Sequence, residues 1–209
     1  MTAAPARAWQ AQSLLLGYPD EALRAHAGLL TRAARSLAPA VGEPLLRFLR
    51  VLGDRPLPEL AAEYVATFDH RKRCCLYLTY YAHGDTRKRG MALLALKQRY
   101  TAAGLTLSDE ELPDHLAVVL EYAAARPGEG RALLLEHRAG LELLRLALRD
   151  DGSPWADVLA SVSATLPPLA GEERQAVAKL AAQGPPAEQV GLAPFAPPEY
   201  MPLTEGAPR

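Results

Sequence analysis

The chain of 209 residues contains no isoleucine, and valine and threonine together account for only 18 positions. Because pleated sheets favour β-branched residues, this scarcity argues against an all-β or a parallel-sheet fold. Alanine and leucine, which both favour helices, occupy 76 of the 209 positions. The composition therefore predicts an all-α fold.

Further absences narrow the classes of function. The only two cysteines, Cys74 and Cys75, are adjacent, which predicts two reduced thiols and a cytoplasmic protein. No run approaches 18 apolar residues, and residues 1–7 do not open a secretory signal, so we expect no direct membrane insertion. The formal net charge of −1 argues against nucleic acid as a partner.

Motifs of catalysis are also missing. The chain has no phosphate-binding glycine loop, no dinucleotide fingerprint, no Gly-x-Ser-x-Gly elbow and no His-Glu-x-x-His. Its five histidines lack metal-ligand spacing, so we predict neither a metal site nor a catalytic residue. Asp114 and His115 are neighbours, but adjacent helical positions point about 100° apart and do not pair easily. A small hydrolase built on His115 stays as an alternative.

Apolar residues recur with helical periodicity along most of the chain. Leu23, Ala27, Leu30, Ala34 and Leu37 form one such stripe, with Asp20 as its N-cap. The pattern predicts a first helix that carries Trp9 and further helices over 20–37, 44–52, 58–68, 85–104, 113–123, 130–149, 154–166 and 172–183. Residues 69–84 fit no clear pattern, although the run over 76–81 is compatible with a buried helix.

The last 26 residues differ from the rest. They contain seven prolines and three glycines, a composition that cannot sustain a helix. The sequence therefore predicts a single-domain helical bundle over residues 1–183, followed by a proline-rich, irregular or flexible tail over 184–209.

Charge is segregated in the middle of the chain. Eight basic residues lie between His70 and Tyr100 against the single acid Asp85, and acids alone follow between residues 109 and 121. One interpretation is that these are solvated faces whose charges partly neutralise each other. The other is a binding surface, with an acidic lip for a basic peptide and a basic lip for an anion such as a phosphate-bearing cofactor.

Three segments carry a resemblance to a known family. Residues 64–69 (YVATFD), 76–81 (LYLTYY) and 84–91 (GDTRKRGM) strongly resemble the NarJ family. Residues 111–122 (ELPDHLAVVLEY) look like the acidic Pro-Asp-His signature of the wider group of redox-enzyme maturation chaperones, the TorD-like proteins. The resemblance extends over essentially the whole chain.

The resemblance implies an all-helical cytoplasmic chaperone that is not an enzyme. Such a protein binds the apo catalytic (alpha) subunit of respiratory nitrate reductase, including its N-terminal segment, and supports molybdenum cofactor insertion and complex assembly. It implies no stably bound cofactor, and at most a transient contact with the molybdenum bis-guanine-dinucleotide cofactor. An alternative is a direct carrier of that cofactor, which would bind it through residues 71–89. Whether the protein is a monomer or a dimer stays open.

The resemblance also supplies candidate client-binding residues. In our hypothesis, tyrosines and leucines form the base of a groove, and Asp114 and Glu121, seven apart on one helix face, meet positive charges of the client. Arg87 and Arg89 would face a phosphate or a client carboxylate. The full candidate set is Tyr64, Phe68, Asp69, Leu76, Tyr77, Tyr80, Tyr81, Asp85, Arg87, Arg89, Glu111, Pro113, Asp114, His115 and Glu121.

Overall fold

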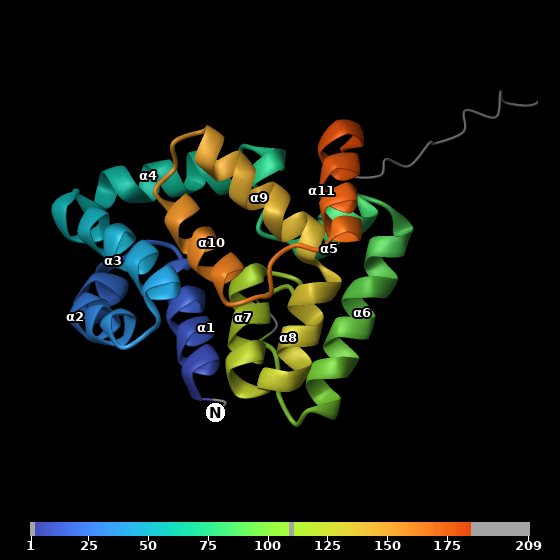
Figure 1. Cartoon of the computed structure of the whole chain (residues 1–209), viewed down its shortest axis with the longest axis horizontal. Helices are drawn as coiled ribbons and strands as arrows, with labels where there is room; N and C mark the ends of the chain where they lie inside the picture. Colours follow the sequence, from blue (N-terminus) through green and yellow to red (C-terminus); the bar gives the residue numbers. More distant parts are fainter. Residues whose placement is uncertain (1–2, 109–110, 185–209) are drawn as a thin grey trace, which may run out of the picture.

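The computed structural model describes residues 3–108 and 111–184. Over these ranges the chain forms eleven α-helices and one short 3₁₀ helix, η1, without a β-strand (Figure 1). In chain order the elements are α1 (Ala3–Leu15), α2 (Glu21–Arg35), α3 (Pro39–Asp54), α4 (Leu57–Phe68), η1 (Lys72–Cys74), α5 (Leu78–His83), α6 (Arg87–Ala102), α7 (Leu116–Ala125), α8 (Pro127–Glu136), α9 (Arg138–Asp150), α10 (Trp155–Ala164) and α11 (Gly171–Gln183).

The prediction of an all-α fold is confirmed, and several helix boundaries differ from the predicted ones. Helix α3 begins at Pro39, five residues before the predicted start at residue 44, so Pro44 lies inside the helix. The helix predicted over 130–149 is two helices, α8 and α9, which meet at His137. Helix α7 begins at Leu116, three residues after Pro113, and the uncertain segment 69–84 contains η1 and α5. Apart from Gly184, the predicted tail lies outside the described residues.

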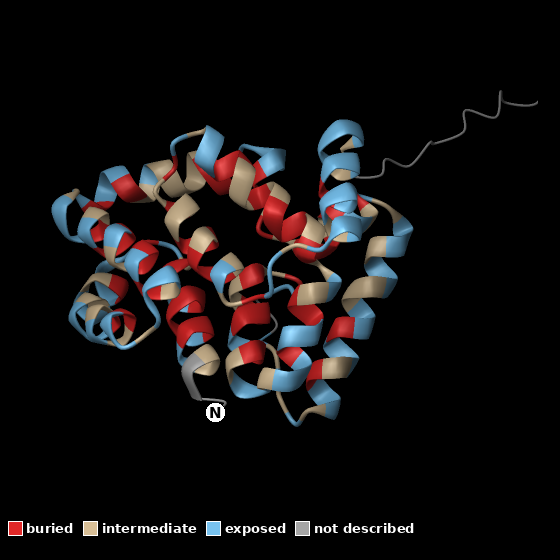
Figure 2. Ribbon diagram, in the orientation of Figure 1, coloured by how far each residue is buried: buried red, intermediate tan, exposed pale blue. Residues whose placement is uncertain are grey.

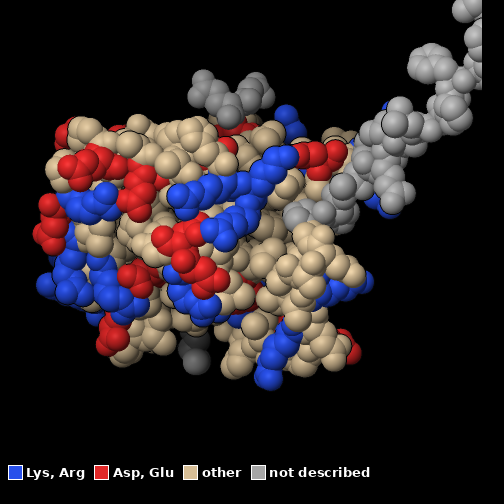
Figure 3. All heavy atoms as spheres, turned by 90° about the horizontal axis from the view of Figure 1, so that it is seen from above, with Lys and Arg blue, Asp and Glu red and all other residues tan. Residues whose placement is uncertain are grey.

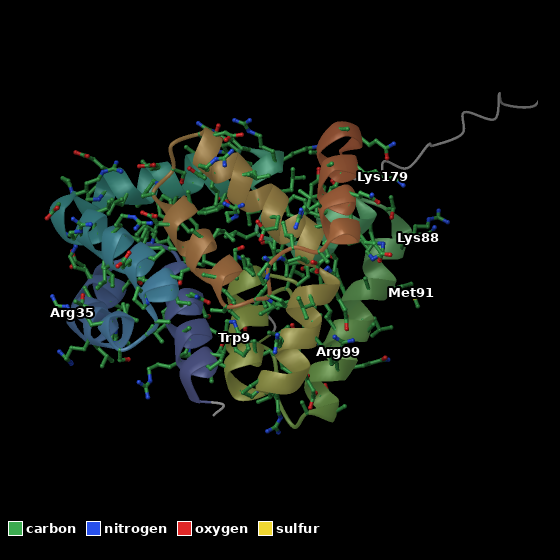
Figure 4. All side chains as sticks on the ribbon, in the orientation of Figure 1. Trp9, Arg35, Lys88, Met91, Arg99 and Lys179 are labelled. Atoms are coloured by element: carbon green, nitrogen blue, oxygen red, sulfur yellow. The ribbon has the colours of Figure 1, made fainter. Side chains whose placement is uncertain are left out.

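Helix α1 packs along α7 and also contacts α2, α3 and α10. Figure 2 shows buried residues along α1, α7, α9 and α10, and Figure 4 labels Trp9 on α1. Polar side chains connect these elements inside the core. Gln12 donates to the Ser161 hydroxyl at 2.8 Å, and Ser161 donates to the Val41 carbonyl at 2.7 Å. Because each donor is buried with an acceptor, these bonds specify how α1, α3 and α10 meet.

Helices α2 and α3 form a pair on one side of α1. Asp20 caps α2 by accepting a hydrogen bond from the Leu23 amide at 2.7 Å, as predicted. Leu23, Leu30 and Ala34 are buried, which confirms the predicted apolar stripe. The two helices approach closely at Gly42, where a Cβ atom would overlap the Ala34 carbonyl.

An aromatic cluster joins α4 to α10. The Tyr64 ring lies 4.7 Å from Phe68 and 5.4 Å from Trp155. The Tyr64 hydroxyl also donates to the Leu16 carbonyl at 3.0 Å. Phe68, a candidate client-binding residue, is thus buried in the core, and Tyr64, another candidate, is half-buried and packs against it. Edge-to-face contacts of such rings add to the burial of apolar area.

Helix α6 lies at one edge of the molecule, and it buries only Leu96 and Tyr100. Figure 4 shows Lys88 and Met91 pointing away from the bundle. Among the described residues, no helix combines the length and the hydropathy needed to span a bilayer.

Two glycines of α8 provide a test of this packing. A Cβ atom at Gly130 would overlap the Ala123 backbone of α7, whereas one at Gly128 meets nothing within 4 Å. We expect Gly130→Ala to lower the free energy of unfolding by about 1–3 kcal/mol through overpacking. Gly128→Ala should leave it unchanged or raise it by up to about 1 kcal/mol, because alanine favours helices. Urea denaturation measures both, and equal effects would contradict the close α7–α8 contact.

Candidate functional site

Two of the sequence motifs meet through backbone pairing. The Leu78 amide donates to the Asp114 carbonyl at 2.9 Å, and the Leu116 amide donates to the Leu76 carbonyl at 2.8 Å. Tyr77 and His115 therefore form an isolated antiparallel bridge. This pairing joins the segment before α5 to the segment before α7, which lie almost 40 residues apart in sequence.

Asp114 is fully buried beside this bridge. Its Oδ2 atom accepts hydrogen bonds from the Thr79 hydroxyl at 2.5 Å and from the Thr79 amide at 3.3 Å. The Arg89 guanidinium lies 3.5 Å from the same oxygen, 3.3 Å from Asp85 Oδ1 and 5.5 Å from the centre of the Tyr77 ring. We call Tyr77, Thr79, Asp85, Arg89, Asp114 and His115 the Asp114 cluster.

His115 belongs to this cluster as a helix cap. Its Nδ1 atom accepts the Ala117 amide at 3.3 Å, and its ring packs edge-on against Tyr77 at 5.4 Å. Burial lowers the pKa of His115, so the neutral imidazole that the cap requires is favoured. The capping role accounts for the position and the burial of His115, and it involves no catalytic step. Within the described residues, no group of three or more His, Cys, Asp and Glu side chains could hold a metal ion.

The prediction that Asp114 and Glu121 share one face of a helix is wrong. Asp114 precedes α7 and faces inward, whereas Glu121 lies exposed on the helix. The helix starts late because residues 114–116 pair with residues 76–78, and the Pro113 carbonyl accepts the Tyr100 hydroxyl at 2.7 Å. These tertiary contacts outweigh the local preference for a helix start at proline.

The tyrosines and leucine predicted to form the base of a groove are divided between the core and the surface. Tyr81 is only 3% exposed, and its hydroxyl donates to the Cys75 and Arg73 carbonyls at 2.9 and 3.1 Å. A Cβ atom at Gly140 would lie 2.8 Å from Tyr81, so α9 approaches this ring closely. Tyr77 and Tyr80 are half-buried, and Leu76 is buried with Tyr81. These residues therefore do not share one exposed surface.

The adjacent thiols lie beside Tyr81. Cys74 is buried and Cys75 is half-buried, and both are free thiols, as predicted. Burial raises the pKa of Cys74 to about 11, so the thiol stays protonated near neutral pH. This environment is that of an inert packing residue.

A groove with acidic side chains lies between α1, α7 and the connection after α6. Its volume is about 570 Å³, and Glu111 and Glu121 are the charged residues among those that line it. We call it the acidic groove. Its other lining residues are Ala6, Gln10, Tyr100, Leu105, Thr106, Leu107, Ser108, Val118, Tyr122, Ala124 and Ala125.

The sequence indicated the carboxylates of this groove but not its apolar part. Leu105 and Leu107 follow Gly104, where α6 has ended, and the helical pattern assigns them no role. Tyr100, on α6, is not among the candidate residues. It packs on Tyr122 with ring centres 4.7 Å apart and lines the groove. The alternation Leu105-Thr106-Leu107, directly before the acids, is the signal that could have indicated this segment.

Among the basic residues between His70 and Tyr100, the structure pairs Arg71, Arg73, Arg89 and Arg99 with carboxylates. Arg71 contacts Asp151 at 2.8 Å, and Arg73 pairs with the same carboxylate. Arg99 lies 3.1 Å from Glu136. Figure 3 shows basic and acidic side chains side by side on the face seen from above. Charges that are segregated in the sequence thus lie next to opposite charges in the fold.

Two remaining candidates lie at the surface outside the acidic groove. Asp69 is exposed at the C-terminal end of α4, and Arg87 is exposed at the first turn of α6. The structure therefore brings five candidates together in the Asp114 cluster and two, Glu111 and Glu121, at the acidic groove.

Comparison with known structures establishes the class of fold. The crystal structure of a protein from Archaeoglobus fulgidus, described as a "putative redox enzyme maturation protein", superimposes with a TM-score of 0.56 at 22% sequence identity. The alignment covers 84% of this chain and 93% of that one. The chain therefore has the same helical fold as that protein, and the prediction of a TorD-like fold is confirmed.

Comparison of sequences then identifies the family. The family model described as nitrate reductase delta subunit matches residues 34–161. A NarJ protein of Bacillus subtilis, named as a probable nitrate reductase molybdenum cofactor assembly chaperone, is 33% identical over 76% of this chain and 87% of its own length. The chain belongs to the nitrate reductase delta subunit family, the NarJ family indicated by its motifs.

Other relatives match over a smaller share of their length. The nitrate reductase-like protein NarX of Mycobacterium tuberculosis is 39% identical over 75% of this chain, which is 24% of NarX. The nitrate reductase molybdenum cofactor assembly chaperone NarJ of Escherichia coli K12 is 37% identical over 55% of this chain and 50% of its own length. The chain thus corresponds to about a quarter of NarX and to half of this NarJ.

We expect Asp114→Ala to lower the free energy of unfolding by about 3 kcal/mol, because it leaves Thr79 and Arg89 without their buried partner. Asp114→Asn should cost less, since the amide oxygen still accepts from Thr79. Asp85→Ala is the matched control, because this exposed carboxylate contributes at most about 1 kcal/mol. Urea denaturation distinguishes them, and equal stability of the Asp114→Ala and Asp85→Ala variants would contradict the cluster.

The lowered pKa of His115 predicts a dependence of stability on pH. Below the ordinary value of 6.5, the unfolded chain binds a proton that the folded chain resists, so stability should fall as pH drops through this region. His115→Asn keeps a capping acceptor without titrating, so it should flatten the fall between about pH 7.5 and about pH 5.5. A smaller fall should persist from His137, whose pKa burial also lowers. An unchanged profile in the variant would show that His115 is not the group responsible.

Proposed function

We propose that this protein is a system-specific chaperone of respiratory nitrate reductase. It binds the apo catalytic subunit, including its N-terminal segment, and supports insertion of the molybdenum cofactor and assembly of the complex. Membership of the family and the names of the NarJ relatives support this role. In this proposal the protein works in the cytoplasm, catalyses no reaction and makes at most a transient contact with the cofactor.

The acidic groove is the observation that carries the client-binding part. Leu105, Leu107 and Val118 supply apolar contact area, and Glu111 and Glu121 supply negative charge at the same groove. An amphipathic segment with basic residues would place its apolar side chains on the leucines and its cations near the carboxylates. Charge complementarity of this kind favours one partner over another and accelerates association.

The Asp114 cluster has a positioning role in this proposal. Asp114 and His115 hold the start of α7, and the Pro113 carbonyl holds Tyr100 of α6. Helix α7 and Tyr100 are parts of the groove wall. The Pro-Asp-His segment therefore supports the groove from behind, while Glu121 faces the client.

The alternative of a direct cofactor carrier through residues 71–89 gains no support from the geometry. Arg71 and Arg73 both pair with Asp151, and Arg89 pairs with Asp85 and Asp114. A phosphate would have to displace these carboxylates. The chaperone is therefore the function that the geometry supports best.

The test is calorimetric titration of the protein with a peptide matching the N-terminus of the nitrate reductase catalytic subunit. We expect saturable binding that weakens with salt, since the carboxylates are exposed. The double variant Glu111→Gln, Glu121→Gln should bind about tenfold more weakly at low salt. Leu107→Ala should weaken binding at every salt concentration, because it removes apolar contact.

Glu59→Gln is the control for the loss of a negative charge elsewhere, because Glu59 is an exposed acid on α4 outside the groove. It should bind the peptide as the unmodified protein does. Equal affinity of the double variant and this control would reject the acidic groove as the client site. Failure of the unmodified protein to bind both the peptide and the folded apo subunit would reject the proposed function.

A further inference from the structure

A buried carboxylate lies between two arginines, outside the acidic groove. Glu142 of α9 is 2% exposed, and its Oε1 atom lies 3.0 Å from Arg138 and its Oε2 atom 2.7 Å from Arg145. Ser163 of α10 donates to Glu142 at 2.6 Å and accepts from Arg138 at 3.2 Å. One carboxylate thus pairs with two guanidinium groups, so Arg138, Glu142 and Arg145 together carry a net positive charge.

Arg138 is the more buried of these two arginines, and two of its nitrogen atoms lack a hydrogen-bond partner in the described part of the chain. Its side chain is 5% exposed, and its Nε and Nη1 atoms have no hydrogen-bond partner among the described residues. Buried polar groups are almost always paired, and a buried charge without full compensation costs several kcal/mol. A guanidinium with two unused donors therefore points to an anion as its missing partner.

These residues line a cleft of about 580 Å³ between α9, α10 and the start of α11. Arg174, which is exposed, adds a third cation, and Glu142 is the acid among the lining residues. Ala40 also lines the cleft, in the first turn of α3, which has no side-chain cap. The amino end of a sixteen-residue helix carries partial positive charge and attracts anions. We call this site the arginine cleft.

We propose that the arginine cleft binds the phosphate or pyrophosphate group of a small molecule. Planar guanidinium groups bind phosphate oxygens through paired hydrogen bonds. The half-buried Arg145 and the exposed Arg174 line the cleft together with Arg138, so a ligand in the cleft can contact them. Leu166 and Pro168 form an apolar wall that can pack against the rest of such a molecule. The cleft shares no lining residue with the acidic groove, so the inference is independent of the proposed function.

The experiment is calorimetric titration of the full-length protein with inorganic pyrophosphate, with adenosine diphosphate and with acetate, at low salt. We expect saturable binding of pyrophosphate with a Kd below about 1 mM, and at least tenfold weaker binding of acetate, since a single carboxylate makes fewer charge-assisted bonds, on the order of half as many. Tighter binding of adenosine diphosphate than of pyrophosphate would show that the apolar wall contributes. Equal binding of these two would support a site for the phosphate groups alone.

Variants localise the site. The double variant Arg145→Gln, Arg174→Gln should weaken pyrophosphate binding about tenfold or more. Arg131→Gln, which removes an exposed positive charge on α8 outside the cleft, is the control. Circular dichroism and the unliganded Tm establish that each variant is folded. Absence of binding, binding of acetate as tight as pyrophosphate, or equal affinity of the double variant and the Arg131→Gln control would each overturn the proposal.

Discussion

The carboxylate of Asp114 is taken out of water, and much of the candidate site depends on how it is compensated. Thr79 donates two hydrogen bonds to it, and Arg89 approaches it from α6. Backbone hydrogen bonds of Asp114 and Leu116 hold the segment before α5 against the start of α7. Since a buried carboxylate without partners is costly, these elements must assemble together. The position of α7, and with it one wall of the acidic groove, follows from this requirement.

Charged residues in this protein serve two different ends. Arg71 and Arg73 with Asp151, and Arg99 with Glu136, are pairs near the surface. Such pairs contribute little stability each but neutralise what the sequence presents as a basic block. Glu111 and Glu121 at the acidic groove lie where apolar surface is also accessible. The arginine cleft is the reverse case, in which a carboxylate fails to balance the guanidiniums around it. We therefore expect the acidic groove and the arginine cleft to bind partners of opposite charge.

The helices were predictable where their apolar stripe is regular and their ends carry local signals. Helix α2, with its Asp20 cap, needs no information from outside its own segment. The start of α7 could not be predicted in this way, because Pro113 and the acids before it form a good local start signal. Pairing with residues 76–78 overrides that signal. The break at His137 is a similar case, since the apolar pattern continues through α8 and α9 while the chain turns between them.

By itself, the sequence determined the helical class, the apolar stripes, the acids before α7 and the motifs that place the chain in its family. Only the tertiary structure decided which of the motif residues face inward and which face solvent. Asp114 and Glu121 are both acids, yet one is buried against Thr79 and the other lines a groove. Tyr81 packs against α9, whereas Tyr100 contributes to the groove. The physical reason is that periodicity records the faces of one helix, whereas burial of a polar group depends on partners supplied by distant segments.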